Sequence, residues 1–240
     1  LCSFDACIIN NRGAAKSCDA LLKRVEENDA NLTELVILPS KTFGGPEVER
    51  LAAALAINTH LVSLSASGHA VPPSSLRVLA QAMVQSTTFT KIAIGDKTMG
   101  DDGVIALCSS GCGNLKGLDL AYKNISETAM KVLGETFGSS THLTELILSR
   151  NPEIGNQGVV AFCNAVSGDD ILPNLQTLSL SECDIGAEGV GYLSTLVIRT
   201  GCTTLGLASN PLGSASCSAL SPLLHGGNLK SLFLSSCELN

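Results

Sequence analysis

Apolar residues recur along this chain at a fixed spacing, with polar residues between them. The pattern apolar-x-x-apolar-x-apolar begins at residues 32, 61, 89, 115, 143, 175, 202 and 229, so successive copies lie 29, 28, 26, 28, 32, 27 and 27 residues apart. Its last two apolar places alternate with polar ones, as in a strand with one buried face. The sequence therefore predicts eight short strands, one in each repeating unit.

The second half of each unit has the spacing of a helix. An apolar residue closes the turn after the strand, and a small residue follows four places later. In the third to sixth units that small residue is Gly103, Ala129, Gly158 and Gly189. Apolar residues such as Val159, Val160 and Phe162 come next on one helical face. Each unit is predicted to form a strand, a turn and a helix, and stacked units would share one core.

These units resemble the leucine-rich repeat family, in the long-period subclass typified by ribonuclease inhibitor. The resemblance covers about residues 32–240. It implies an α/β solenoid shaped as a curved horseshoe, with parallel strands on the concave face and helices on the convex face. We expect residues 32–240 to form one array of about eight units, of which the last is incomplete.

The ninth position of the units alternates between two residue types in the C-terminal half. It holds Asn151, Cys183, Asn210 and Cys237, which is similar to the two repeat types of ribonuclease inhibitor. An Asn or Cys there is expected to turn inward and hydrogen-bond the backbone of the turn. The first four units carry Ser40, His69, Lys97 and Lys123 instead. We expect distorted turns there, with both lysines pointing outward, because lysine is rarely buried unpaired.

Residues 1–31 lie outside the repeat and are predicted to form an N-terminal helical cap. The segment "AAKSCDALLKRVEE" has the pattern of an amphipathic helix, and a solenoid needs its terminal core covered. The stretches "LLKRVEENDANLTELVIL" and "LAAALAINTHLVSLSA" are similar to the entry of the tropomodulin leucine-rich domain. That resemblance covers roughly residues 21–107. The polar turn at 167–174 is expected to bulge from the rim.

Positions three, five and seven of each unit are predicted to form the concave face, because side chains alternate across a strand. Of these 24 positions, sixteen are Ser, Thr, Gly or Ala. The other eight are candidate partner-binding residues: Glu34, Val36, Leu38, Lys91, Asp119, Glu145, Ile147 and Phe233. Interface energy concentrates in Trp, Tyr and Arg, which these positions lack. A partner would therefore lie close on this face, or bind the helices, rims or C-terminal end, which the sequence favours.

Composition and charge narrow the classes of partner. The net charge is -7, and Lys and Arg form no cluster of the kind that binds phosphates. Nucleic acid is not expected as a partner, and a small-molecule ligand is not favoured. No apolar run approaches the ~18 residues of a membrane span. The sequence favours an intracellular, cytoplasmic protein, although import into an organelle stays open because the first residue is not Met.

Candidate chemistry is sparse, and the sequence predicts no enzyme, cofactor or metal site. His60 and His142 occupy equivalent loop places, and no Gly-rich phosphate loop or nucleophile elbow is present. The pairs Asp101/Asp102 and Asp169/Asp170 fit a helix start and a polar turn. Ten cysteines form no CxxC pair. A disulfide among four of them stays open: Cys2, Cys7, Cys18 and Cys112.

Three functions follow as hypotheses. The first is a non-catalytic protein–protein interaction module, a scaffold or structural subunit within a larger assembly. The second, implied by the tropomodulin resemblance, is an actin-filament regulator. The third is a GTPase activator, because Ran GTPase-activating proteins have similar repeats. That activity would need a positioned rim residue, and Arg150 stands at a strand-to-turn corner.

Overall fold

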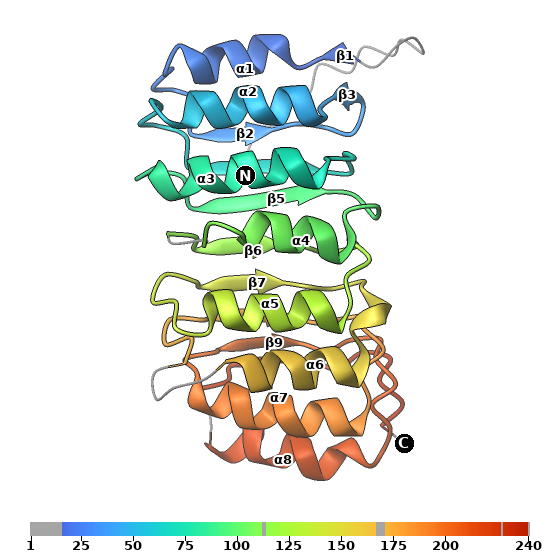
Figure 1. Ribbon diagram of the computed structural model, residues 1–240. Coiled ribbons are helices and arrows are strands. Elements are labelled where there is room, and N and C mark those ends of the chain that lie inside the picture. The colour runs from blue at the N-terminus through green and yellow to red at the C-terminus, as the bar shows by residue number, and fades with distance from the viewer. Residues whose placement is uncertain (1–15, 112–113, 167–170, 227, 240) are drawn as a thin grey trace, which may run out of the picture.

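A computed structural model describes residues 16–111, 114–166, 171–226 and 228–239. In these ranges the chain winds through alternating strands and helices, which form two layers (Figure 1). All the helices lie on one side of the sheet and follow one another in chain order from α1 to α8. The predicted α/β leucine-rich repeat solenoid, with strands on the concave face and helices on the convex face, is confirmed.

The helices and strands have the following bounds. The helices are α1 (Asp19–Glu26), α2 (Gly45–Leu55), α3 (Pro73–Gln85), α4 (Gly100–Cys108), α5 (Glu127–Phe137), α6 (Gly155–Ala165), α7 (Ala187–Arg199) and α8 (Ser216–Gly226), with a 3-10 turn η1 (Pro152–Ile154). The strands are β1 (Lys16–Ser17), β2 (Glu34–Val36), β3 (Lys41–Thr42), β4 (Ser63–Ser67), β5 (Lys91–Gly95), β6 (Gly117–Asp119), β7 (Glu145–Ile147), β8 (Thr177–Ser179), β9 (Thr204–Gly206) and β10 (Ser231–Phe233).

One parallel sheet runs the length of the molecule in the order β10-β9-β8-β7-β6-β5-β4-β2. Neighbouring strands pair at the same position of each unit, so the fourth positions form one column. That column is Leu35, Leu64, Ile92, Leu118, Leu146, Leu178, Leu205 and Leu232. All but the last are buried. The leucine spacing therefore creates a continuous core between the sheet and the helices.

Small residues let neighbouring helices approach closely, most of all between α5 and α6. A Cβ atom on Gly134 would lie 2.7 Å from the Cβ of Ala165 and 2.7 Å from the carbonyl oxygen of Phe162. On α7, by contrast, a Cβ on Gly191 would meet nothing within 4 Å. The two glycines therefore have different roles, although both lie inside helices.

We expect Gly134→Ala and Gly191→Ala to change stability in opposite directions. Alanine favours a helix over glycine by about 1 kcal/mol, so Gly191→Ala should stabilise by about 0.5–1 kcal/mol. At Gly134 overpacking outweighs that gain, and a net loss of about 1–2 kcal/mol is expected. Urea denaturation of the two variants measures both values. Shifts of the same sign would contradict this account of the α5–α6 contact.

At the N-terminal end, α1 packs against α2. Leu22 and Val25 of α1 are buried in the shared core. Arg50 of α2 donates to Asp19 at 2.8 Å and to Glu26 at 2.9 Å, which joins the two helices outside that core. The strand pair β1–β3 lies beside this end and was not expected from the sequence. That residues 1–31 form a cap stays a prediction.

Candidate functional site

The concave face consists of residue rows that cross the sheet in register. Position three forms the row Glu34, Ser63, Lys91, Gly117, Glu145, Thr177, Thr204 and Ser231. Position five forms the row Val36, Ser65, Ala93, Asp119, Ile147, Ser179, Gly206 and Phe233. Seven of the eight sequence-predicted site residues lie in these two rows. Leu38, the eighth, lies just beyond β2.

The structure divides the predicted site residues into three groups. At the N-terminal end Val36 and Leu38 are 52% and 60% exposed, next to Glu34. At the opposite end Phe233 is 54% exposed. Seven strand spacings of ~4.8 Å separate these ends by about 34 Å. The remaining four residues, Lys91, Asp119, Glu145 and Ile147, come together in the middle of the face.

The central group surrounds a shallow hollow of about 210 Å³. Gly117 lies between Lys91 and Glu145 in the position-three row, so no side chain separates the two. A Cβ on Gly117 would lie 3.2 Å from Cγ of Lys91 and 3.6 Å from Oε2 of Glu145. Asp119 and Ile147 border the same hollow from the position-five row. The hollow has the size of one side chain and offers groups of both charges.

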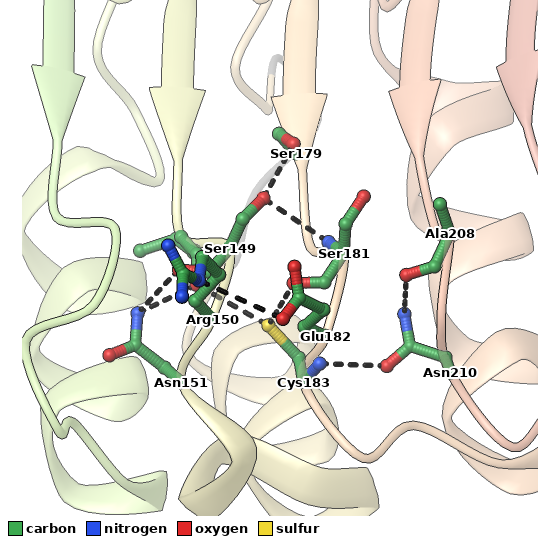
Figure 2. Close-up of polar contacts among 10 residues, drawn as sticks. Ser149, Arg150, Asn151, Ser179, Ser181, Glu182, Cys183, Ala208 and Asn210 are labelled. Carbon is green, nitrogen blue, oxygen red and sulfur yellow. Dashed lines mark hydrogen bonds and ion pairs between the residues drawn. The ribbon is translucent and has the colours of Figure 1, made fainter.

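Hydroxyl groups on the concave face are partly engaged with one another. The hydroxyls of Ser149 and Ser179 lie 2.7 Å apart, and the amide of Ser181 donates to Ser149 at 3.2 Å (Figure 2). This part of the face is therefore smooth, and its hydroxyls hold adjacent units together. The region around Lys91 and Glu145 offers a partner charged groups, whereas the serine-rich region offers hydroxyls that are partly engaged with one another.

Beside the concave face, the strands end in turns that form what we call the turn rim, positions eight to ten of units four to eight. Asn151 and Asn210 point into these turns (Figure 2). Asn151 donates to the carbonyls of Leu120 and Leu148, at 2.9 and 2.7 Å, and accepts from the amide of Lys123 at 2.8 Å. Asn210 repeats this pattern one unit pair later. The predicted inward role of these asparagines is confirmed.

The cysteines of the turn rim also point inward, and each thiol makes one hydrogen bond to the preceding unit. The thiol of Cys183 donates to the carbonyl of Leu148 at 3.3 Å, and that of Cys237 donates to Leu207 at 3.1 Å. Burial raises the pKa of Cys183 to about 11 and that of Cys163, on α6, to about 12. Both thiols are therefore protonated near neutral pH and weakly nucleophilic.

At position nine, the outward direction expected for Lys123 is wrong, and His69 lies in the place of an inward asparagine. His69 is buried and its Nε2 lies 3.2 Å from the carbonyl oxygen of Ile37, so the imidazole replaces the asparagine link. Lys123 is also buried, at 3% exposure, rather than pointing outward. The turn of its unit has the same left-handed residues as the Cys183 unit: Tyr122 and Asn124 correspond to Glu182 and Asp184. Lys97 is exposed, as expected.

Lys123 buries a charged group beneath the turn rim. Its Nζ atom donates to the hydroxyl of Ser67, two units away, at 3.3 Å. Burial lowers the pKa of this amine, and the carboxylates of Asp119 and Asp96 oppose that effect in part. The aliphatic part of the side chain therefore fills the place that Cys183 and Cys237 fill in later units. The sequence did not reveal this, because its partner is 56 positions away.

Residues of the turn rim make a further set of contacts that the sequence-based site left out. The guanidinium of Arg150 lies 5.0 Å from the ring centroid of Tyr122. Its Nε lies 3.7 Å from Oε2 of Glu182. All three residues occupy position eight of consecutive units, outside the strand alternation. The column of side chains at position eight was the feature of the sequence that could have revealed these contacts. The side chain of Arg150 is 59% exposed on this rim.

Other candidate groups have structural roles. Asp101 lies at the start of α4, as expected, and accepts from the amide and hydroxyl of Ser126 at 2.8 and 2.6 Å. Asp169 and Asp170 lie outside the described residues, as do Cys2, Cys7 and Cys112. Across the described ranges, no three His, Cys, Asp or Glu side chains are placed to share a metal ion. None of the helices in those ranges is long and apolar enough to cross a membrane.

Comparisons with known proteins agree with this geometry. A family model described as "Leucine Rich repeat" matches residues 139–163 and 172–194. The ribonuclease inhibitor of Mus musculus is 30% identical over 183 residues, which cover 73% of this chain and 38% of that protein. NACHT, LRR and PYD domains-containing protein 3 of Homo sapiens is 29% identical over 140 residues, which cover 56% of this chain and 13% of that protein. The chain thus spans well under half of these relatives.

Two solved structures share the fold. Leiomodin-1 Actin-Binding Site 2 aligns with a TM-score of 0.52 and 18% identity, covering 62% of this chain and 86% of that one. A Bacteroides fragilis protein aligns with a TM-score of 0.52 and 16% identity, covering 90% and 70%. At these identities the likeness concerns the fold alone. The chain is a leucine-rich repeat protein with repeats of the ribonuclease-inhibitor type.

Proposed function

We propose that this chain is a non-catalytic protein–protein interaction module that binds its partner on the concave face. Leucine-rich repeat proteins generally mediate such interactions. The observation that carries the proposal is the central hollow, where the side chains of Lys91 and Glu145 lie over Gly117 from either side and offer a partner both charges. Opposite charges on either side of that space would fix the partner's register.

The ends of the concave face support the same proposal. Val36 and Leu38 at one end and Phe233 at the other are large apolar side chains that are more than half exposed. Between them the face consists largely of small residues, so a partner can lie close to the sheet. Apolar contacts at both ends and polar contacts in the middle would together bury an extended area. The proposed contact residues are Glu34, Val36, Leu38, Lys91, Asp119, Glu145, Ile147 and Phe233.

We propose that the chain acts as a scaffold or structural subunit within a larger assembly, in an intracellular, cytoplasmic setting. Reduced thiols support that setting, because Cys183, Cys202 and Cys237 each donate to backbone carbonyls. The likeness to the leiomodin structure does not favour actin over another protein, since it concerns the fold alone.

A pair of charge-exchange variants tests the proposal. We expect Lys91→Glu with Glu145→Lys to abolish retention of the partner that the immobilised wild-type chain captures from its native source. The matched control is Lys131→Glu with Glu135→Lys on α5, an exposed ion pair at 3.8 Å on the convex face. Both variants keep the net charge. Mass spectrometry identifies the retained protein, and cross-linking locates it.

The control variant should retain the partner fully. Loss of the partner in the α5 variant, with retention in the concave-face variant, would place the interaction on the helices. Retention of no protein at all by the wild-type chain would contradict the interaction module itself.

A further inference from the structure

The turn rim contains a second hollow, of about 420 Å³, on the side of the sheet where the strands end. Pro152 and Pro211 form two of its walls, and Asp184 belongs to the unit between them. Tyr122, Arg150, Glu182 and Ser209 also line it. We call this hollow the rim notch. It is separate from the Gly117 hollow, which is lined by strand residues.

The residues around the rim notch project from a rigid backbone. Tyr122, Arg150, Glu182 and Ser209 all adopt left-handed conformations at position eight. Each of their amides donates to the position-seven carbonyl of the following unit, at distances of 2.7–3.0 Å: Tyr122 to Ser149, Arg150 to Ser181, Glu182 to Ala208 and Ser209 to Ser235. Because these turns are tied together, the side chains are held at fixed spacing along the rim.

The rim notch is acidic and has an aromatic wall. Glu182 and Asp184 are exposed, and within the described ranges neither carboxylate accepts a hydrogen bond. Glu238 adds a third exposed carboxylate on the same rim, and the exposed Glu153 follows directly after the rim positions in the Arg150 turn. Tyr122 is 52% exposed and presents its ring to the guanidinium of Arg150. An aromatic face beside carboxylates is the environment that a guanidinium prefers.

Arg150 occupies this environment only loosely. Its guanidinium is 5.0 Å from the Tyr122 ring centroid, and the 3.7 Å distance to Glu182 is too long for a hydrogen bond. The ion pair is exposed on both sides, at 59% and 56%. Exposed contacts of these kinds are individually weak. A second guanidinium that reached both carboxylates could displace Arg150 from the ring.

We propose that the rim notch binds an arginine side chain of a protein partner, and that Arg150 is its intramolecular competitor. The partner's guanidinium would stack on Tyr122 and donate to Glu182 and Asp184. This assignment rests on the proposed interaction function and extends it, because it gives the partner a basic residue at the rim in addition to its contacts on the concave face. Charge complementarity is the reason for choosing a basic partner: three carboxylates and one guanidinium are exposed on this rim, and Glu153 is exposed just beyond it.

The test uses Nα-acetyl-L-arginine amide as a probe, titrated into the isotopically labelled chain and followed by amide chemical shifts. We expect millimolar binding that shifts the amides of Glu182, Asp184 and Ser209. Arg150→Ala should tighten binding about threefold, since it removes the competing cation. Glu182→Gln with Asp184→Asn should weaken it about fivefold or more. The uncharged analogue, acetyl-citrulline amide, should cause no shifts there.

A matched control separates local competition from overall charge. Lys116→Ala removes one exposed positive charge directly before β6, at the end of the strands opposite to the turn rim, and should leave the affinity unchanged. Equal tightening by Lys116→Ala and Arg150→Ala, or shifts confined to the strands, would overturn the proposal. Because the probe needs no partner, this result is independent of the retention experiment. The rim assignment can therefore fail while the interaction module stands.

Discussion

Asn151→Ala is expected to destabilise the protein by about 3–5 kcal/mol, which would unfold much of a marginally stable domain. The side chain is completely buried and serves backbone groups of two units: the amides of Lys123 and Ile125 and the carbonyls of Leu120 and Leu148. Alanine leaves these groups without a partner, and each unsatisfied buried group costs about 1–3 kcal/mol. Urea denaturation followed by circular dichroism measures the loss.

The control for this variant is Asn174→Ala. Asn174 is exposed and donates one hydrogen bond, to the carbonyl of Thr141 at 2.7 Å. Its removal should cost about 1 kcal/mol or less. Losses of similar size at the two sites would show that the bonds inside the turn do not stabilise the array in the way described.

Lys123→Met is expected to stabilise the protein, by about 2–3 kcal/mol near neutral pH. Methionine keeps most of the aliphatic length and removes a buried charge whose one hydrogen bond among the described residues is to the hydroxyl of Ser67. Lys97 occupies the same position of the preceding unit and is exposed. Lys97→Met should therefore change stability by no more than about 0.5 kcal/mol. Urea denaturation compares the two variants, and equal effects would contradict the structural difference between these lysines.

Burial of Lys123 should also make the stability of the folded protein depend on pH. The pKa of Lys123 is lowered in the folded state, chiefly by burial, and is ordinary in the unfolded state. Between the lowered pKa and the ordinary lysine pKa of 10.5 the unfolded chain binds more protons, so stability rises with pH in that window. Lys123→Met should remove this increase. The stability difference between wild type and variant is thus expected to shrink as pH is raised from 7 toward 10.

Most of the fold could be predicted from the sequence, because the residues that recur in every unit are the ones that pack against the adjacent unit. Each buried leucine of the strand column had to fall at the fourth position of its unit, and each inward Asn or Cys at the ninth. These residues contact the adjacent unit, so a single repeat pattern contains the information. Positions three and five likewise identified the residues around the Gly117 hollow.

The residues that could not be predicted make contacts beyond that nearest-neighbour pattern. Lys123 is accommodated through Ser67, two units away, and no rule for position nine includes such a partner. His69 takes the asparagine place because an imidazole nitrogen can reach the same carbonyl, which residue-type preferences alone did not suggest. Tyr122 and Glu182 lie at position eight, where the strand alternation has ended and side-chain direction depends on the left-handed turn.

The alternation of Asn and Cys along the turn rim makes pairs of repeats, and not single ones, the natural building block of this molecule. Asn151 makes three hydrogen bonds to the unit before it, whereas the thiol of Cys183 makes one to the unit before its own. Asn210 and Cys237 repeat this inequality. A deletion of residues 143–201 removes one complete pair, with Asn151 and Cys183, and leaves the Asn210 unit after the Lys123 unit, where an Asn unit now stands. A deletion of a single repeat would bring two like turns together, so shortened arrays should tolerate losses in steps of about 55–60 residues far better than in steps of half that length.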